Sequence, residues 1–161
     1  MIRPVKVQDA DAITAIYNHY VTETTVSFET KPLTVSEMAA RIEDIASQYP
    51  YCVYEEDGRV LGYCYAHRWK ERAAYGCTAE TTVYLAPEAI GRGIGRALMT
   101  EIIDWCRSLL FKSLIACITA ENTASIDFHR SLGFTQVSDF KEVGYKFGRY
   151  LDVVDLQLTL E

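Results

Sequence analysis

Several features that mark particular classes of protein are missing from this sequence of 161 residues. It has no apolar run long enough to cross a membrane, no low-complexity tract, no internal repeat and no recognisable signal peptide. Its hydrophobic fraction of 49% and charged fraction of 24% are typical of soluble globular proteins. We therefore expect one soluble domain over residues 1–161, without a membrane partner.

The five cysteines lack the spacing of a metal or redox site, because no two of them form Cys-x-x-Cys. Their number is odd, and most lie in apolar runs, which is typical of reduced, buried thiols in a cytoplasmic protein. They are Cys52, Cys64, Cys77, Cys106 and Cys117. His19 and His67 have no ligand partners at useful spacing, so no metal site is expected.

Basic residues are in the minority, with 16 Lys and Arg against 22 Asp and Glu and a net charge of −6. A nucleic-acid partner is not expected, because a phosphate backbone selects a basic surface. An acidic chain can still bind a phosphorylated small molecule where local backbone amides hold the phosphate.

The most informative stretch runs from Ala79 to Leu98. A β-branched and apolar run predicts a strand up to Leu85, and Pro87 marks its end because proline lacks the amide that a strand needs. A helical pattern follows, after three glycines at alternate positions: Gly91, Gly93 and Gly95. This arrangement presents free amides at the positive end of a helix dipole, so we expect a phosphate or pyrophosphate ligand.

Two common phosphate-binding motifs are excluded here. The stretch has no Gly-Lys-Ser/Thr, which a nucleoside triphosphate loop requires. Counted from Gly91, Arg96 occupies the third glycine position of the dinucleotide fingerprint, and some eighty residues precede a turn that should come first in that fold. A glycine turn without any ligand remains the alternative.

The segment Gly93-Ile94-Gly95-Arg96-Ala97-Leu98 resembles half of the acetyl-CoA pyrophosphate loop of the GNAT acetyltransferase superfamily. The resemblance implies that backbone amides in this turn hold the diphosphate, with an arginine nearby. The residues implied are Gly91, Arg92, Gly93, Ile94, Gly95 and Arg96. The family loop usually begins with Arg or Gln where this chain has Ile90, so one side-chain contact is in question.

Periodicity and turn signals along the chain predict the order β-α-α-β-β-β-α-β-α-β-β. The expected strands are 2–4, 51–55, 60–66, 77–85, 113–119, 134–140 and 150–160, with a connection over 144–148. The expected helices run from Asp9 or Asp11 to about 21, from Thr34 to about 48, from the glycine turn to about 110, and from Asn122 to Gly133. This is the order of the GNAT fold, which implies a mixed α/β protein with a mostly antiparallel central sheet and helices on both faces.

Five segments, in order, resemble the phosphinothricin and methionine sulfoximine N-acetyltransferase branch of that superfamily: 16–20, 25–30, 69–72, 79–84 and 144–148. Glu29 departs from the branch, whose phosphinothricin enzymes often carry Arg there. Cys77 departs as well, because Trp is common at that position. Both departures bear on the acceptor pocket.

The resemblance implies catalytic roles for two residues. Glu80 corresponds to the general base, and a carboxylate among apolar residues has a raised pKa that suits a base near neutral pH. His129 corresponds to the acid that protonates the departing thiolate, or else it packs beneath the cofactor. Strands that separate beside the cofactor leave amides for the acetyl carbonyl and pantetheine at Val83, Tyr84 and Leu85. Asn122 caps a helix, and the family contact with pantetheine is compatible with that role.

The acceptor site implied by the resemblance contains Lys70 and Arg72, of which Arg suits bidentate carboxylate binding. Its other predicted members are Phe28, Tyr75 and Lys146, the last in a segment that closes the pocket from the second subunit of a homodimer. The sequence thus predicts an acetyl-CoA-dependent N-acetyltransferase acting on a small zwitterionic amine, such as phosphinothricin or methionine sulfoximine. The alternatives are a GNAT enzyme for peptide N-termini or polyamines, and a non-catalytic acyl-CoA-binding module.

Overall fold

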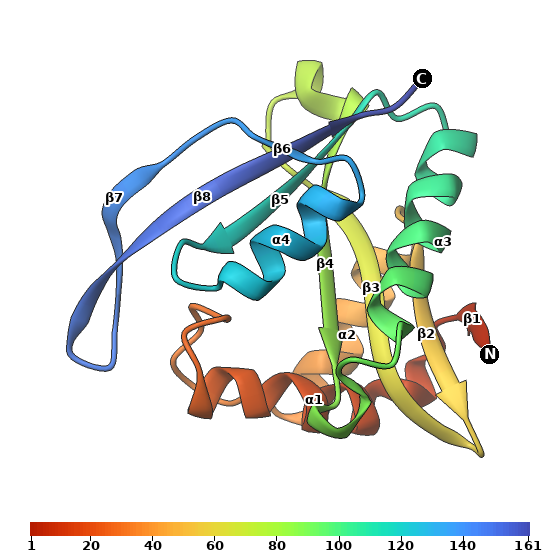
Figure 1. The fold of residues 1–161 in the computed structure, drawn as a ribbon. Helices are drawn as coiled ribbons and strands as arrows, with labels where there is room; N and C mark the ends of the chain where they lie inside the picture. The colour runs from red at the N-terminus through yellow and green to blue at the C-terminus, as the bar shows by residue number, and fades with distance from the viewer.

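A sheet of eight strands forms the centre of the structure, a computed structural model that describes residues 1–161 (Figure 1). The order is β1-β2-β3-β4-β5-β8-β6, and β7 pairs with β8. The strands are β1 Ile2–Pro4, β2 Tyr51–Glu56, β3 Arg59–Arg68, β4 Thr78–Leu85, β5 Ser113–Thr119, β6 Thr135–Gln136, β7 Phe140–Lys146 and β8 Arg149–Thr159. Only β4 and β5 run parallel, which confirms the predicted mostly antiparallel sheet.

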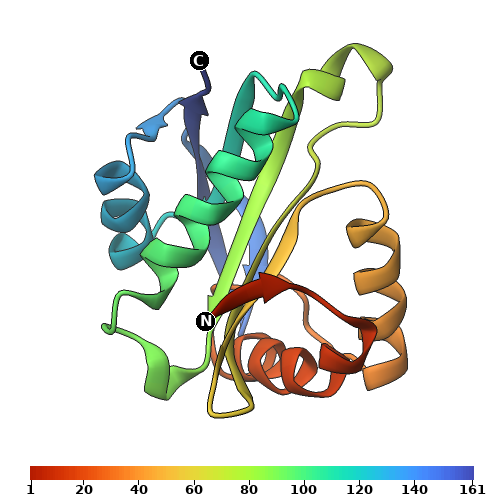
Figure 2. The ribbon, with the colours of Figure 1, turned by 90° about the vertical axis from the view of Figure 1, so that its right-hand side faces the viewer.

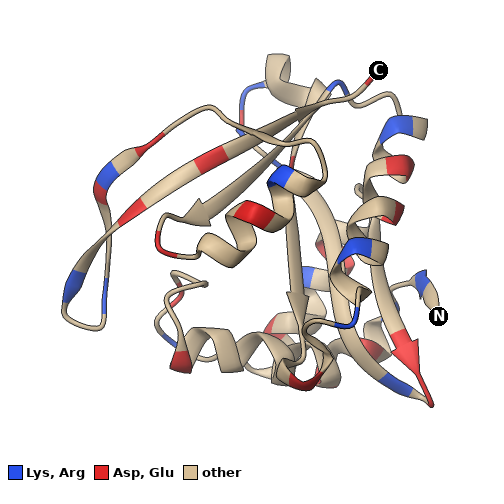
Figure 3. Cartoon of the chain, in the orientation of Figure 1, with Lys and Arg blue, Asp and Glu red and all other residues tan.

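Helices cover both faces of the sheet, as predicted (Figure 2). Helices α1 (Ala10–Glu23) and α2 (Val35–Ala46) lie on one face, and α3 (Ile94–Ser108) and α4 (Thr123–Ser131) lie on the other. No helix combines the length and the apolar character needed to cross a membrane. Charges of both signs are interspersed along the helices and strands (Figure 3).

Local sequence signals fix several element ends. The Thr34 hydroxyl and the Glu37 carboxylate form the predicted capping box at the start of α2. The β2–β3 hairpin turns at Asp57 and Gly58, whose φ values of 51° and 74° suit a tight turn of this hand. Gly133, at φ 98°, follows the end of α4 as predicted.

The C-terminal part of the sheet corrects the sequence prediction. The expected strand over 134–140 is reduced to the two residues of β6, and the expected connection over 144–148 is largely strand β7. β7 and β8 form a long hairpin that projects from the sheet, here called the arm (Figure 1). Its turn is Phe147-Gly148, with φ values of 53° and 74°. Phenylalanine is uncommon in such a turn, so the usual Asn-Gly or Asp-Gly signal is absent.

The cysteines are all free, as expected, but only part of the burial prediction is correct. Cys52, Cys64 and Cys106 are buried, whereas Cys77 and Cys117 are exposed. Cys77 lies at the end of a short surface turn before β4, and Cys117 faces an open cavity that is described below.

Strands β4 and β5 separate soon after they begin. They pair only from Thr78 to Glu80 on β4 and from Ser113 to Ile115 on β5. β4 then continues to Leu85 beside β3, while β5 continues to Thr119 beside β8. Beyond Glu80 the facing edges of the two strands are unpaired, which leaves backbone groups free in the middle of the sheet. Helix α3 packs on one face of the sheet, and its buried residues, including Leu98 and Ile102, belong to the hydrophobic core.

Candidate active site

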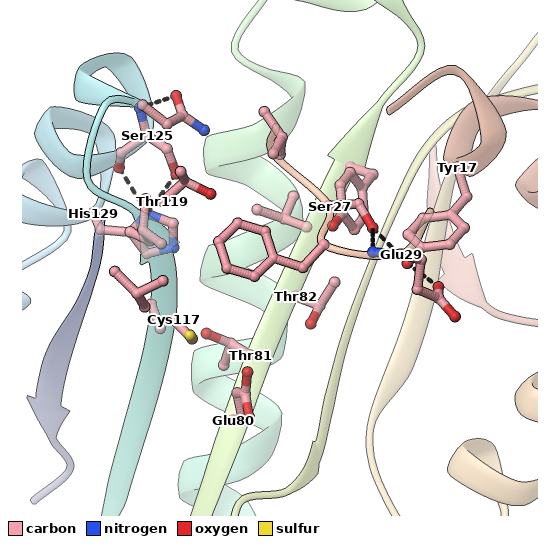
Figure 4. Close-up of a pocket in the computed structure, with 18 of the residues that line it drawn as sticks. Tyr17, Ser27, Glu29, Glu80, Thr81, Thr82, Cys117, Thr119, Ser125 and His129 are labelled. Atoms are coloured by element: carbon pink, nitrogen blue, oxygen red, sulfur yellow. Dashed lines mark hydrogen bonds between the residues drawn. The ribbon is translucent and has the colours of Figure 1, made fainter. Parts of the chain in front are cut away.

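A cavity of about 460 Å³ lies where β4 and β5 separate (Figure 4). It is lined by the two strands, by the loop over 26–29 and by one side of α4, including its N-cap. Figure 4 shows Glu80 from β4, Cys117 from β5 and His129 from α4 around this space. The lining also includes the predicted site residues Phe28, Val83, Tyr84 and Asn122. The sheet therefore brings together a carboxylate, an imidazole and unpaired strand edges.

Glu80 sits at the point where the strands part. Burial, reinforced by the negative charge of Asp155, raises the pKa of the Glu80 carboxyl to about 7. The side chain is still 27% exposed, so it reaches the cavity. A carboxylate that binds a proton near pH 7 has the properties of a general base for an amine.

Glu29, where the family branch often has arginine, is held by neighbouring groups. Its carboxylate pairs with Arg41 of α2 and accepts a hydrogen bond from the Tyr17 hydroxyl, which also contacts the Ser27 hydroxyl at 2.8 Å. The Arg41 contact lowers the pKa of Glu29. The Glu29 charge in the cavity wall is thus balanced by Arg41.

His129 is 4% exposed, and its Nδ1 lies 2.8 Å from the Ser125 carbonyl oxygen. This contact assigns the Nδ1 proton to the hydrogen bond and leaves Nε2 as an acceptor in the neutral ring. Burial lowers the pKa of His129, which disfavours the imidazolium. The ring also packs edge-on against Phe128 and Phe134, each 5.2 Å away between centroids. The packing role is thus present, and proton donation to a thiolate stays a prediction.

The glycine turn has the backbone that the motif predicts. Gly91 and Gly93 adopt φ values of 82° and 80°, and Gly93 is the N-cap of α3 without any side-chain cap. No amide from Gly91 to Arg96 donates a hydrogen bond within the protein; the first to do so is Ala97, to the Gly93 carbonyl. The turn therefore presents free donors at a helix N-terminus, as anion binding requires.

Side chains around this turn are already partnered. Arg92 forms a 2.8 Å ion pair with Glu56, and Arg96 donates to the Ser131 hydroxyl at 2.6 Å. Ile94 and Gly95 are buried, and Ile90 is 60% exposed. The amides, and not the arginines, are thus the groups that lack a partner.

Of the remaining predicted cofactor residues, Val83, Tyr84 and Asn122 line the cavity, and Leu85 ends β4. The Leu85 carbonyl accepts a hydrogen bond from the Tyr20 hydroxyl at 2.5 Å. Asn122 caps α4 by accepting from the Ser125 amide at 3.3 Å, which confirms its predicted capping role.

Four of the predicted acceptor residues lie outside the cavity lining. Lys70 packs over the Trp69 ring at 4.4 Å, next to Tyr75, and Arg72 precedes the same short surface turn. Lys146 is buried, and its ammonium donates to the Ser27 carbonyl at 2.6 Å. This hydrogen bond holds Lys146 against the loop that carries Phe28. Direct contact of these four side chains with an acceptor stays a prediction.

Sequence reasoning missed several residues that line the cavity: Tyr17, Ser27, Tyr65, Thr82, Cys117, Thr119 and Ser125. Alternation along β4 places Thr82 on the same face as Glu80, so that residue had a detectable signal. The others come from elements whose approach depends on the tertiary fold.

The geometry thus combines free amides at the start of α3 with a carboxyl of raised pKa where β4 and β5 separate. The chain belongs to the acetyltransferase (GNAT) domain family, which it matches over residues 2–154.

Similar proteins agree with this assignment. The chain is 44% identical over 161 residues to a phosphinothricin N-acetyltransferase of Alcaligenes faecalis, covering 99% of this chain and 82% of that protein. It is 38% identical over 156 residues to an L-methionine sulfoximine/L-methionine sulfone acetyltransferase of Salmonella typhimurium, covering 95% and 90%. A phosphinothricin acetyltransferase from Sinorhizobium meliloti, solved in complex with AcCoA, superposes with a TM-score of 0.96 at 39% identity, covering 99% and 88%.

Proposed function

We propose that this chain is an N-acetyltransferase that moves an acetyl group from acetyl-CoA to the amino group of a small amino acid or a toxic analogue, of the phosphinothricin or methionine sulfoximine type. The observation that carries the proposal is Glu80, a carboxyl with its pKa raised to about 7 at the point where β4 and β5 separate. The names of the relatives support the substrate class.

The residues present fit acetyl-CoA. The free amides from Gly91 to Arg96 suit its diphosphate, and the unpaired edge of β4 at Val83 and Tyr84 suits the amide-containing pantetheine chain. When bound, acetyl-CoA supplies the acetyl group as a thioester. Asn122 and His129 lie on the opposite wall of the cavity and complete the binding surface.

Glu80 gives the site its chemistry. An amino acid carries a protonated amine at neutral pH, and only the neutral amine has the lone pair needed for attack. The Glu80 carboxylate takes that proton directly or through one water. Positioning of the amine next to the thioester can lower the barrier by up to about 7–11 kcal/mol, which is more than the about 10²–10⁴-fold in rate that a base contributes.

A CoA-release assay over a panel of amines tests the proposal. We expect turnover with methionine sulfone, methionine sulfoximine or phosphinothricin. Turnover only with peptides or polyamines favours the other enzyme class. Acetyl-CoA binding without turnover on any amine favours a non-catalytic binding module. A detoxifying role and a cytoplasmic location belong to the same proposal, and the five free thiols support the location because they suit a reducing compartment.

The acceptor anchors give a prediction for Arg72, which makes no ion pair in the structure. Loss of a hydrogen bond to a charged group costs about 1.5–3 kcal/mol, so Arg72→Ala is expected to raise the acceptor KM by about tenfold or more. The acetyl-CoA KM should stay unchanged. Steady-state kinetics with each substrate varied in turn measures both values. Arg107→Ala, at the far end of α3, is the control, and an equal loss for both substrates contradicts the assignment.

A homodimer formed through the arm is part of the proposal. Six apolar side chains in and beside the arm are at least half exposed: Val137, Phe140, Val143, Tyr145, Phe147 and Tyr150. A concentration of exposed apolar groups of this kind is typical of a protein–protein interface. We propose a second copy of this chain as the partner that covers these side chains. The arm also contacts the cavity loop, because Lys146 donates to the Ser27 carbonyl and Gly144 lies against the Phe28 ring. A partner bound to the arm would therefore lie next to the cavity.

Light scattering tests the dimer. The unmodified chain should have twice its monomer mass, and Tyr150→Lys should convert it to the monomer, because a buried unpaired charge is costly at an interface. Leu110→Lys, at an exposed apolar residue after α3, should leave the dimer intact. A monomeric unmodified chain would contradict the proposal.

A further inference from the structure

Glu80 must lose its proton once in every catalytic cycle if, as proposed above, it accepts one from the amine. The cavity it faces then holds both substrates, so the route by which that proton leaves is a separate question. The side of Glu80 that faces away from the substrates offers a route for the proton while the first cavity is occupied. The residues on that side come from the neighbouring strand β3.

His67 is the titratable group closest to Glu80 on β3. The two residues are directly opposite each other in the antiparallel β3–β4 register, so their side chains project from the same face of the sheet. Nε2 of His67 lies 3.7 Å from Oε2 of Glu80. This is slightly longer than a hydrogen bond and can close by a small rotation of the carboxylate.

His67 also lines a second cavity, of about 450 Å³, on the face of the sheet covered by α2. The other lining residues include Arg41, Asp44, Tyr49, Arg68 and Glu71. His67 does not line the first cavity, whereas Tyr65 lines both. The His67 side chain is 31% exposed. It thus stands between Glu80 and a separate polar opening to solvent.

We propose that His67 carries the proton of Glu80 to the second cavity and so regenerates the base without opening the substrate site. The Glu80 carboxylic acid gives its proton to Nε2 of His67 and returns to the carboxylate. The resulting imidazolium then releases one ring proton to water or buffer in the second cavity. No other reactant is consumed, and His67 acts on the reaction only through Glu80.

The charges around the pair are compatible with this transfer. In the second cavity, Arg68 pairs with Glu71, and Arg41 pairs with Glu29, which leaves Asp44 as the lining carboxylate without an ion pair. On the other side of Glu80, the negative charge of Asp155 on β8 disfavours the Glu80 carboxylate, and Glu80 and Asp155 together raise the pKa of the Cys117 thiol. Burial raises the pKa of Glu80 to about 7 and lowers the pKa of His67, so the imidazolium is the stronger acid of the two and passes its proton on to water or buffer in the second cavity.

His67→Ala tests the route, with His67→Gln as a variant that keeps the side-chain volume. Both should lower kcat by about tenfold in dilute buffer, less than the about 10²–10⁴-fold expected from loss of the base. Added imidazole should restore the kcat of His67→Ala in proportion to its concentration. The single-turnover acetyl transfer rate and acetyl-CoA affinity should stay unchanged, because Glu80 begins that cycle as the carboxylate.

His19→Ala, which removes a histidine on α1, is the matched control and should show neither loss nor rescue. An unchanged kcat in both His67 variants, or a loss that imidazole does not restore, overturns the proposed route. A variant that also loses acetyl-CoA affinity indicates a purely structural role and counts against it as well. If the unmodified protein turns over no amine, the proposed function itself fails.

Discussion

Glu80→Gln should lower kcat by about 10²–10⁴-fold, the usual contribution of a general base. Glutamine keeps the size and polarity of the side chain but cannot take up a proton at these pH values. Activity should remain measurable, because positioning of the two substrates does not depend on this carboxylate. Acetyl-CoA affinity, measured by calorimetry, should be unchanged, since Glu80 lies near the start of β4 and the glycine turn follows the end of that strand.

The pH dependence identifies the base more specifically. With a pKa of about 7, Glu80 is active only as the carboxylate, so kcat should rise with pH through about 7 and then level off. Glu80→Gln should lose this inflection. Glu29→Gln is the contrast within the same cavity, because Arg41 holds the pKa of Glu29 below its usual range and the inflection should persist.

Stability gives an independent check with a defined sign. The pKa of Glu80 is higher in the fold than its ordinary value of 4.5, so its contribution to stability is fully present below pH 4.5 and is lost as the pH rises through about 7. Glutamine is never ionised, so at high pH it lacks the cost of burying a charged carboxylate. Glu80→Gln should therefore melt at the same or a higher temperature than the unmodified protein at pH 8. A lower melting temperature together with lost activity would indicate structural damage instead.

The fold was largely predictable because its signals are local. The glycine turn between β4 and α3, the Thr34 capping box and the Asp57-Gly58 hairpin each depend on a few adjacent residues. The arm was not predictable in this way. Its turn uses Phe147-Gly148, and Glu142 adopts a φ of 54° where the register shifts within β7. No common turn or strand pattern marks either position.

The site was predictable only where its residues lie on one strand or one turn. Glu80 and the glycine turn are close together in the sequence, and the resemblance to a family supplied the predicted roles of Glu80 and His129 and the pantetheine contact of Asn122. The contact between His67 and Glu80 depends on the register of two strands, and that between Glu29 and Arg41 on the docking of a loop against α2. Composition and spacing carry no information about either distance. The burial of Lys146 depends in the same way on how the arm packs.

Gly93→Val is expected to weaken acetyl-CoA binding by about tenfold or more, or at least about 1.4 kcal/mol. Gly93 is the N-cap of α3 at φ 80°, in the left-handed region that β-branched residues avoid. Keeping valine in the left-handed conformation would cost about 1–2 kcal/mol. The substitution therefore drives the backbone toward negative φ. That rotation changes the direction of the amides that follow Gly93. Several hydrogen bonds to the acetyl-CoA diphosphate are then lost at once.

Gly148→Val separates this effect from strain alone. Gly148 has a φ of 74°, and a Cβ at either glycine would meet no atom within 4 Å, so the local cost should be similar. It lies at the tip of the arm, remote from the start of α3 (Figure 1). Calorimetry should therefore find unchanged acetyl-CoA affinity in Gly148→Val and a weakened affinity in Gly93→Val, with similar losses of thermal stability. Equal affinities in the two variants would refute the glycine turn as the diphosphate site, because only that site requires the amides after Gly93 to keep their direction.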